Sequence, residues 1–206
     1  MHDSESFKSR KGELVLQNTA RSSLAPSVIR IFRKGPYRTR GKSVNGTELL
    51  RRFLVRLGRD QALLSAIEPD AFDGRLQTWI NRFPKQIRRA KGKVSYGQKA
   101  KVVNVFLKGL VESRHGLPRQ KAQTLERFLH VPVDSRVHER VWTWWGCELG
   151  AFGAGALTKE NTLLARLERR EYKLLQEFFR HKASQLRTEP IWFDYEAWAV
   201  RDKAPS

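Results

Sequence analysis

Cysteine is almost missing from this chain of 206 residues, in which Cys147 is the only one. A single thiol excludes an internal disulfide, a four-cysteine zinc site and a cysteine-ligated iron–sulfur cluster. The sequence also has no long apolar run and no signal-peptide pattern, so we expect neither a membrane span nor secretion. These absences predict a cytoplasmic protein without a metal ion or cofactor, and the length suits a monomer of one domain or two close subdomains.

Acidic residues are also scarce, with 21 Asp and Glu against 40 Lys and Arg, which gives a formal net charge of +19. Such an excess indicates a polyanionic partner, with nucleic acid the first candidate and an anionic membrane surface the second. Residues 74–111 contain ten Lys and Arg and no carboxylate. A solvated helix face normally mixes both signs, so this segment favours phosphate contact. Its predicted DNA contacts are Arg82, Lys85, Arg88, Arg89, Lys91, Lys93 and Lys101.

The chain divides by pattern into a basic arm and a helical remainder. Residues 1–44 carry ten Lys and Arg against three acids and show little helical periodicity, with short strands expected at Glu13–Gln17 and Val28–Phe32. From residue 45 to residue 206 the apolar spacing is helical. We expect helices over 47–66, 73–90 with a break at Pro84, 95–113, 118–129, 134–149, 158–186 and 194–200. The predicted fold class is mostly α, with a basic, partly β, N-terminal arm.

One carboxylate has a distinctive setting. An apolar run that ends in Pro132 and Val133 leads to Asp134 and then, from Ser135, to a helical pattern. Asp at such a position acts as an N-cap and lies at the positive end of the helix. Two interpretations stay open at this point. Asp134 is either a helix cap with no catalytic role, or a fixed, ionised carboxylate that acts in catalysis next to a sugar.

A second segment, residues 95–105, places Gly97 at a helix start whose first turns are basic. Backbone N–H groups at such a start bind phosphate well, and Lys99 and Lys101 would add charge. Tyr96 and Gln98 would either contact the nucleic acid or pack against the protein.

Together the two segments resemble the helix-hairpin-helix superfamily of DNA glycosylases. The run Gly97–Ala100 is similar to that family's helix start beside DNA, and Val131–Asp134 is similar to the motif that supplies its catalytic aspartate. The resemblance implies a compact fold of two lobes with a cleft, and Asp134 as the catalytic residue. Lys99 falls where bifunctional members keep their Schiff-base lysine. The Leu-Pro-Gly-x-Gly hairpin is missing, however, and Lys99 is 35 positions before Asp134, so we expect Lys99 to hold phosphate.

The resemblance implies an enzyme that extrudes a base from double-stranded DNA and leaves an abasic site. Its substrate would be a modified or damaged base, such as a hypermodified cytosine in phage DNA, which would make the protein part of an antiviral defence. The alternatives are a non-catalytic DNA- or RNA-binding protein and a nuclease subunit. The residues predicted to form the base pocket are Trp142, Trp145, His138 and Asn104.

Overall fold

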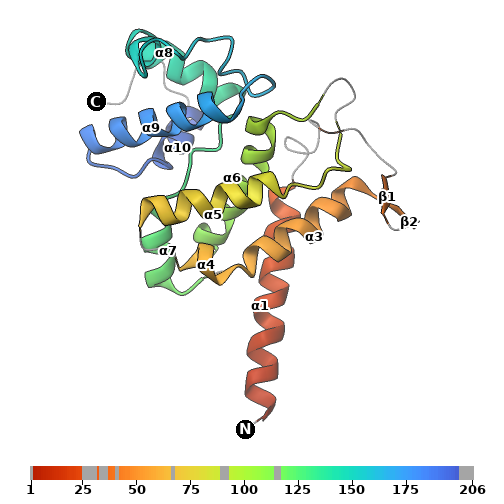
Figure 1. Ribbon diagram of the computed structural model, residues 1–206. Coiled ribbons are helices and arrows are strands. Elements are labelled where there is room, and N and C mark those ends of the chain that lie inside the picture. Colours follow the sequence, from red (N-terminus) through yellow and green to blue (C-terminus); the bar gives the residue numbers. More distant parts are fainter. Residues whose placement is uncertain are drawn as a thin grey trace. The chain divides into compact units, whose positions relative to one another are not determined.

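The computed structural model describes residues 2–24, 32, 37–39, 42–65, 68–88, 93–113 and 117–199 (Figure 1). Side chains are described from residue 13 onward, except in the two strands. Within this part the chain forms nine helices and one hairpin, so the prediction of a mostly α-helical protein is confirmed. The helices are α1 (His2–Ser23), α3 (Gly46–Gly58), α4 (Gln61–Leu64), α5 (Pro69–Asn81), α6 (Tyr96–Glu112), α7 (Arg119–Glu126), α8 (Ser135–Ala151), α9 (Arg169–Gln185) and α10 (Trp192–Trp198).

The chain forms two compact units. Unit 1 consists of residues 1–93 and 105–126, and unit 2 consists of residues 94–104 and 127–206. Helix α6 therefore contributes its first half to unit 2 and its second half to unit 1. In the part of the chain that the structure describes, no helix is long and apolar enough to cross a membrane.

The core of unit 1 is built on α3. Leu50, Phe53, Leu54 and Leu57 recur at the spacing of one helix face and are all buried. Helix α1 packs on α3 at Gly58, where a Cβ atom would lie 2.6 Å from Leu16 Cδ2. Glycine at this position therefore lets the two helices approach closely.

The strand predicted at Glu13–Gln17 is wrong, because these residues lie inside α1. The buried positions of that helix include Thr19, Ala20 and Ser23, which have helical spacing but are small or polar. A hydrophobic pattern search does not detect such a face. The predicted strand Val28–Phe32 lies outside the described residues except for Phe32, which is buried.

A hairpin is nevertheless present in the N-terminal region. Strand β1 (Tyr37–Thr39) pairs with β2 (Lys42–Val44) in antiparallel register, with Tyr37 opposite Val44 and Thr39 opposite Lys42. Neither strand coincides with the strands predicted for the arm, most of whose described residues form α1.

Asp60 ends the helix that was predicted to continue to residue 66. It caps α4 by accepting a hydrogen bond from the N–H of Leu63, and it also accepts bonds from Arg75 Nε at 2.8 Å and from the indole of Trp79. Burial opposes the charge of Asp60, but the bonds from Arg75 and Trp79 outweigh it and hold the pKa of this carboxyl below its usual value. The next helix, α5, begins four residues earlier than predicted and ends before Pro84.

Unit 2 holds α8, α9 and α10 around an aromatic core. Trp145 lies 5.3 Å from Phe193 and 6.3 Å from Phe178, ring centre to ring centre. The backbone of Trp145 is non-helical and kinks α8 at this point.

The helix predicted over 158–186 is wrong in its first part, since α9 begins only at Arg169. The side chains of Thr158 and Asn161 each accept a hydrogen bond from the other's backbone N–H and so form a local turn. Leu167 is fully buried within the non-helical stretch and fills the space that Gly97 leaves open.

Candidate functional site

Asp134 is the N-cap of α8, as predicted. Its Oδ1 atom accepts hydrogen bonds from the backbone N–H groups of Arg136 at 2.9 Å and Val137 at 3.0 Å. Its side chain is 12% exposed. One carboxylate oxygen is therefore fixed by the helix start, and Oδ2 is the oxygen that remains for other contacts.

Oδ2 of Asp134 forms an ion pair with a lysine of α6. Lys101 Nζ lies 3.5 Å from it, and the lysine side chain is 9% exposed. Both charged groups are thus largely shielded from water. A buried ion pair of this kind is screened much less than one at the surface. The resemblance placed Lys99 at the position of the lysine beside the catalytic aspartate, although we expected both Lys99 and Lys101 to hold phosphate. In the structure Lys101 makes this contact, and Lys99 is half-buried in the turn before it.

Backbone N–H groups at the start of α6 donate hydrogen bonds to other groups of the protein. Ser95 and Gln98 form a capping box, in which Gln98 Oε1 accepts from the N–H of Ser95 and Ser95 Oγ accepts from the N–H of Gln98. The N–H of Gly97 donates to the carbonyl of Leu167 at 2.8 Å. The N–H groups of Gly97 and Gln98, for which the sequence predicted a phosphate, are therefore satisfied internally. Tyr96 is buried and packs on Tyr172 with ring centres 5.2 Å apart.

A chain of buried polar groups begins one helix turn after Lys101. Asn104 Nδ2 donates to Tyr172 Oη at 2.8 Å, and His130 Nδ1 lies 2.7 Å from the same oxygen. Arg180 donates to His130 Nε2 at 2.9 Å. Because an arginine only donates, Nε2 accepts and the ring proton of His130 is on Nδ1, directed to Tyr172. The Oδ1 atom of Asn104 is buried without a hydrogen-bond partner.

Gln176 of α9 fixes the segment that leads to Asp134. Its Oε1 accepts from the N–H of Val131 at 2.9 Å, and its Nε2 donates to the carbonyl of Val131 at 3.0 Å. Leu129 and Val133 on either side are buried. The carboxylate is therefore placed by α9 as well as by its own helix. Sequence reasoning missed Tyr172, Gln176 and Arg180, for which no local motif exists.

The four residues predicted to form a base pocket lie in three different settings. Asn104 belongs to the Tyr172 chain. His138 Nε2 lies 2.9 Å from the carbonyl of Lys159, and Trp142 Nε1 donates to Thr162 Oγ1 at 2.8 Å. Trp145 is part of the aromatic core of unit 2.

His138 is expected to make stability depend on pH. Burial is the main cause that lowers the pKa of His138 below its ordinary value, so the unfolded chain binds this proton more readily than the folded one. The stability from neutral His138 is present above the pKa of the unfolded residue, about 6.5, and falls as the pH drops below it. Urea unfolding at pH 7.5 and pH 5.5 checks this: the loss on acidification should be smaller in His138→Gln than in the wild type. An equal loss in both would contradict it.

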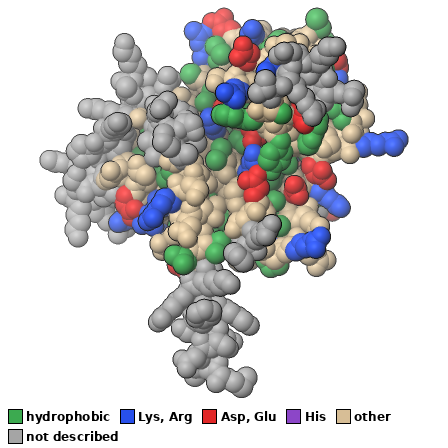
Figure 2. All heavy atoms as spheres, turned by 180° about the vertical axis from the view of Figure 1, so that it is seen from behind, with side chains coloured by type: hydrophobic (Ala, Val, Ile, Leu, Met, Phe, Trp, Pro, Cys, Tyr) green, Lys and Arg blue, Asp and Glu red, His purple; other side chains and the backbone are tan. Residues whose placement is uncertain are grey.

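Most basic residues of the acid-free segment belong to unit 1, whereas Lys99 and Lys101 belong to unit 2. Arg82, Lys85, Arg88 and Lys93 are exposed, whereas Arg89 and Lys91 lie outside the described residues. Asp134 belongs to unit 2, so a surface shared with these cations stays a prediction. On the face drawn in Figure 2, side chains of Lys and Arg and of Asp and Glu are both exposed among the described residues.

The site thus consists of Asp134, Lys101 and the buried chain from Asn104 to Arg180, all within unit 2. Such a carboxylate, held by backbone amides and paired with an ammonium group, can stabilise positive charge that develops on a ligand next to Oδ2. Within the described ranges, no three His, Cys, Asp or Glu side chains are grouped to hold a metal ion. Comparison with known proteins finds no protein family, curated protein or solved structure that matches this chain.

Proposed function

We propose that this protein is a DNA N-glycosylase, with Asp134 as the carboxylate beside the sugar of the target nucleotide. The observation that carries the proposal is the largely buried Lys101–Asp134 pair at the N-terminus of α8. The pair provides what the reaction requires, namely a carboxylate that is fixed in place.

Hydrolysis of an N-glycosidic bond passes through a sugar with positive charge at C1′. Oδ2 of Asp134 would stabilise that charge while Oδ1 remains bonded to the amides of Arg136 and Val137. Water adds its oxygen to C1′, the base leaves with the bonding electron pair, and the proton of water is passed on to the base. Lys101 is a positioning residue in this scheme, because it holds the carboxylate and does not touch the sugar.

The charge of +19 supports DNA as the partner, since each cation near a phosphate releases condensed counterions. The resemblance of two segments to helix-hairpin-helix glycosylases supports the reaction. Within the proposal the target is a modified or damaged base, with hypermodified cytosine of phage DNA the first substrate to try.

A second candidate function is a nucleic-acid-binding protein in which Asp134 only caps α8. It is favoured by the two capping bonds to Oδ1 and by the low exposure of the carboxylate. The two functions differ in one respect that can be measured, the release of a base.

The test uses the wild-type protein and a panel of end-labelled DNA duplexes with unmodified, alkylated, oxidised or hypermodified bases. After incubation, hot alkali cleaves the strand wherever a base has been lost. We expect cleavage at one class of modified base. Tight binding with no cleavage on any duplex would leave the binding protein as the function.

We further predict monofunctional chemistry. Lys101 Nζ is engaged in the ion pair with Oδ2 of Asp134, whereas an amine that attacks the sugar has to be free of such a contact. The abasic strand should remain intact until alkali is added, and borohydride should trap no covalent adduct. An adduct that is lost in Lys101→Ala but kept in Lys99→Ala would overturn this prediction and make Lys101 the attacking amine.

A further inference from the structure

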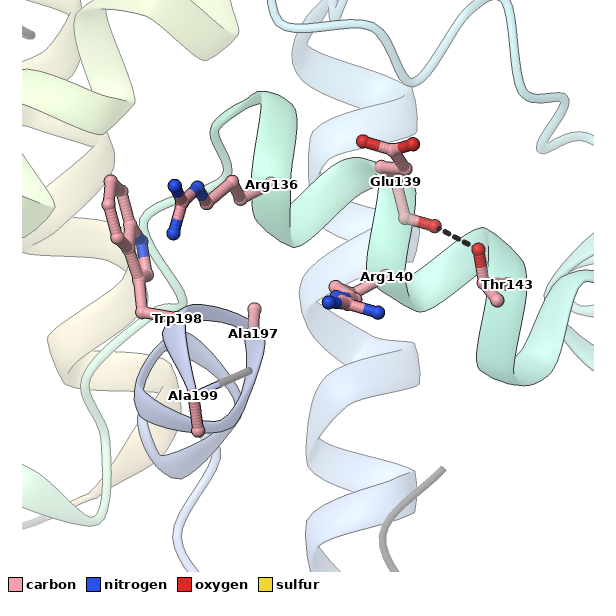
Figure 3. Close-up of a pocket in the computed structure, with 7 residues that line it drawn as sticks. All are labelled: Arg136, Glu139, Arg140, Thr143, Ala197, Trp198 and Ala199. Carbon is pink, nitrogen blue, oxygen red and sulfur yellow. Dashed lines mark hydrogen bonds between the residues drawn. The ribbon is translucent and has the colours of Figure 1, made fainter. Parts of the chain in front are cut away.

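A cavity of about 410 Å³ lies between α8 and α10 in unit 2 (Figure 3). Sequence reasoning assigned it no role, and it shares with the Asp134 site only Arg136, whose backbone N–H donates to Asp134 Oδ1. Its lining combines two arginines, a carboxylate, a hydroxyl and an indole. The lining residues are Arg136, Glu139, Arg140, Thr143, Ala197, Trp198 and Ala199.

The polar side of the cavity is one face of α8. Arg136 and Arg140 are four residues apart, so their side chains emerge from neighbouring turns of the same face. The hydroxyl of Thr143 donates a hydrogen bond to the backbone carbonyl of Glu139 at 2.9 Å. The lining thus presents two guanidinium groups, which can donate hydrogen bonds to the oxygens of a phosphodiester.

The indole of Trp198 forms the other side. The side chain is 49% exposed, one of the few large apolar groups of the described residues that is open to solvent. Arg136 Cζ lies 4.3 Å from the centre of its ring, and Figure 3 shows the guanidinium directed at the indole. An arginine stacked in this way keeps N–H donors at its edge for a planar or tetrahedral anion.

We propose that this cavity binds one nucleotide of a single nucleic-acid strand. The base stacks on the exposed part of Trp198, and the phosphate accepts hydrogen bonds from Arg136 and Arg140. A paired base has its faces covered by its neighbours, so a lone indole selects an unpaired one. The inference rests on the proposed function in one respect only, namely that the partner is a nucleic acid.

Fluorescence anisotropy tests the proposal with three labelled probes. They are oligothymidylate, an abasic oligonucleotide of the same length, and a duplex. Trp198→Ala should weaken binding of oligothymidylate by roughly tenfold, as for the loss of one stacked base. Binding of the abasic strand and of the duplex should change by less than about twofold, because neither presents an unpaired base. Trp198→Phe keeps an aromatic face and should restore most of the affinity.

Arg170→Ala is the matched control for the arginines, since Arg170 is an exposed residue of α9 outside the cavity. Arg140→Ala should weaken binding of both single strands several-fold more than Arg170→Ala does. Equal effects of the two arginine variants, or wild-type affinity of Trp198→Ala for oligothymidylate, would overturn the proposal. Because these readouts measure binding, they remain decisive even if no base release is found.

Discussion

Asp134→Asn is expected to reduce base release by roughly 10³-fold or more, the effect of removing a charge that the transition state requires. The amide oxygen of asparagine still accepts from the N–H groups of Arg136 and Val137, so the cap of α8 is kept. DNA affinity should remain, because Asp134 contributes no attraction to phosphate. Single-turnover base release, measured next to anisotropy on the same duplex, separates the two effects.

A matched control is available in the other unit. Asp60 is also a buried N-cap, and it holds Arg75 and Trp79 as Asp134 holds Lys101. Asp60→Asn should therefore lower thermal stability and leave the rate of base release of the folded protein near that of the wild type. Wild-type turnover by Asp134→Asn would exclude Asp134 as the catalytic carboxylate.

The position of Asp134 could be predicted from the sequence because a cap is a local feature. The cap needs only features that follow one another within a few residues: an apolar run, a proline, an aspartate and a helical pattern. In the structure the helix begins directly after the aspartate, as this order predicts. The helices over 95–113 and 134–149 were found for the same reason, to within two residues at each end.

The lysine that pairs with Asp134 could not be predicted in this way. Lys99 and Lys101 are two residues apart on α6, which is about 200° around a helix. One therefore faces nearly opposite to the other, and only the packing of α6 decides which of them points to Asp134. A motif position that is uncertain by two residues consequently selects the wrong side of the helix.

The buried chain behind Asp134 shows the same limit at longer range. Asn104 and Tyr172 are 68 positions apart, and His130 and Tyr172 are 42 apart. Each is unremarkable in its own segment. The helix predicted from residue 158 fails for a related reason, because the apolar positions up to Leu167 fit a helix as well as the observed turns. The side-chain bonds of Thr158 and Asn161 decide against the helix.

Lys101→Met is expected to lower the free energy of unfolding by about 3 kcal/mol, as when one partner of a buried ion pair is removed. The Asp134 carboxylate is then left with little access to water and without its counter-charge, while methionine fills much of the same space. Urea unfolding at pH 7.5 measures the effect. Lys99→Met is the control, since it removes the same charge two residues away and outside the pair, and it should cost less than about 1 kcal/mol.

Adding Asp134→Asn to Lys101→Met should return most of the lost stability, because the double variant has neither a buried charge nor a broken cap. Asp134→Asn alone leaves the ammonium unpaired and should lie between the wild type and Lys101→Met, since a lysine stem can bend its charge toward water more readily than a short aspartate. The coupling energy is the difference between the stability loss of the double variant and the sum of the two single losses. It should be well above the few tenths of a kcal/mol found for independent sites. Additive losses in the double variant would show that Lys101 does not hold Asp134, and the positioning role proposed for it would be lost.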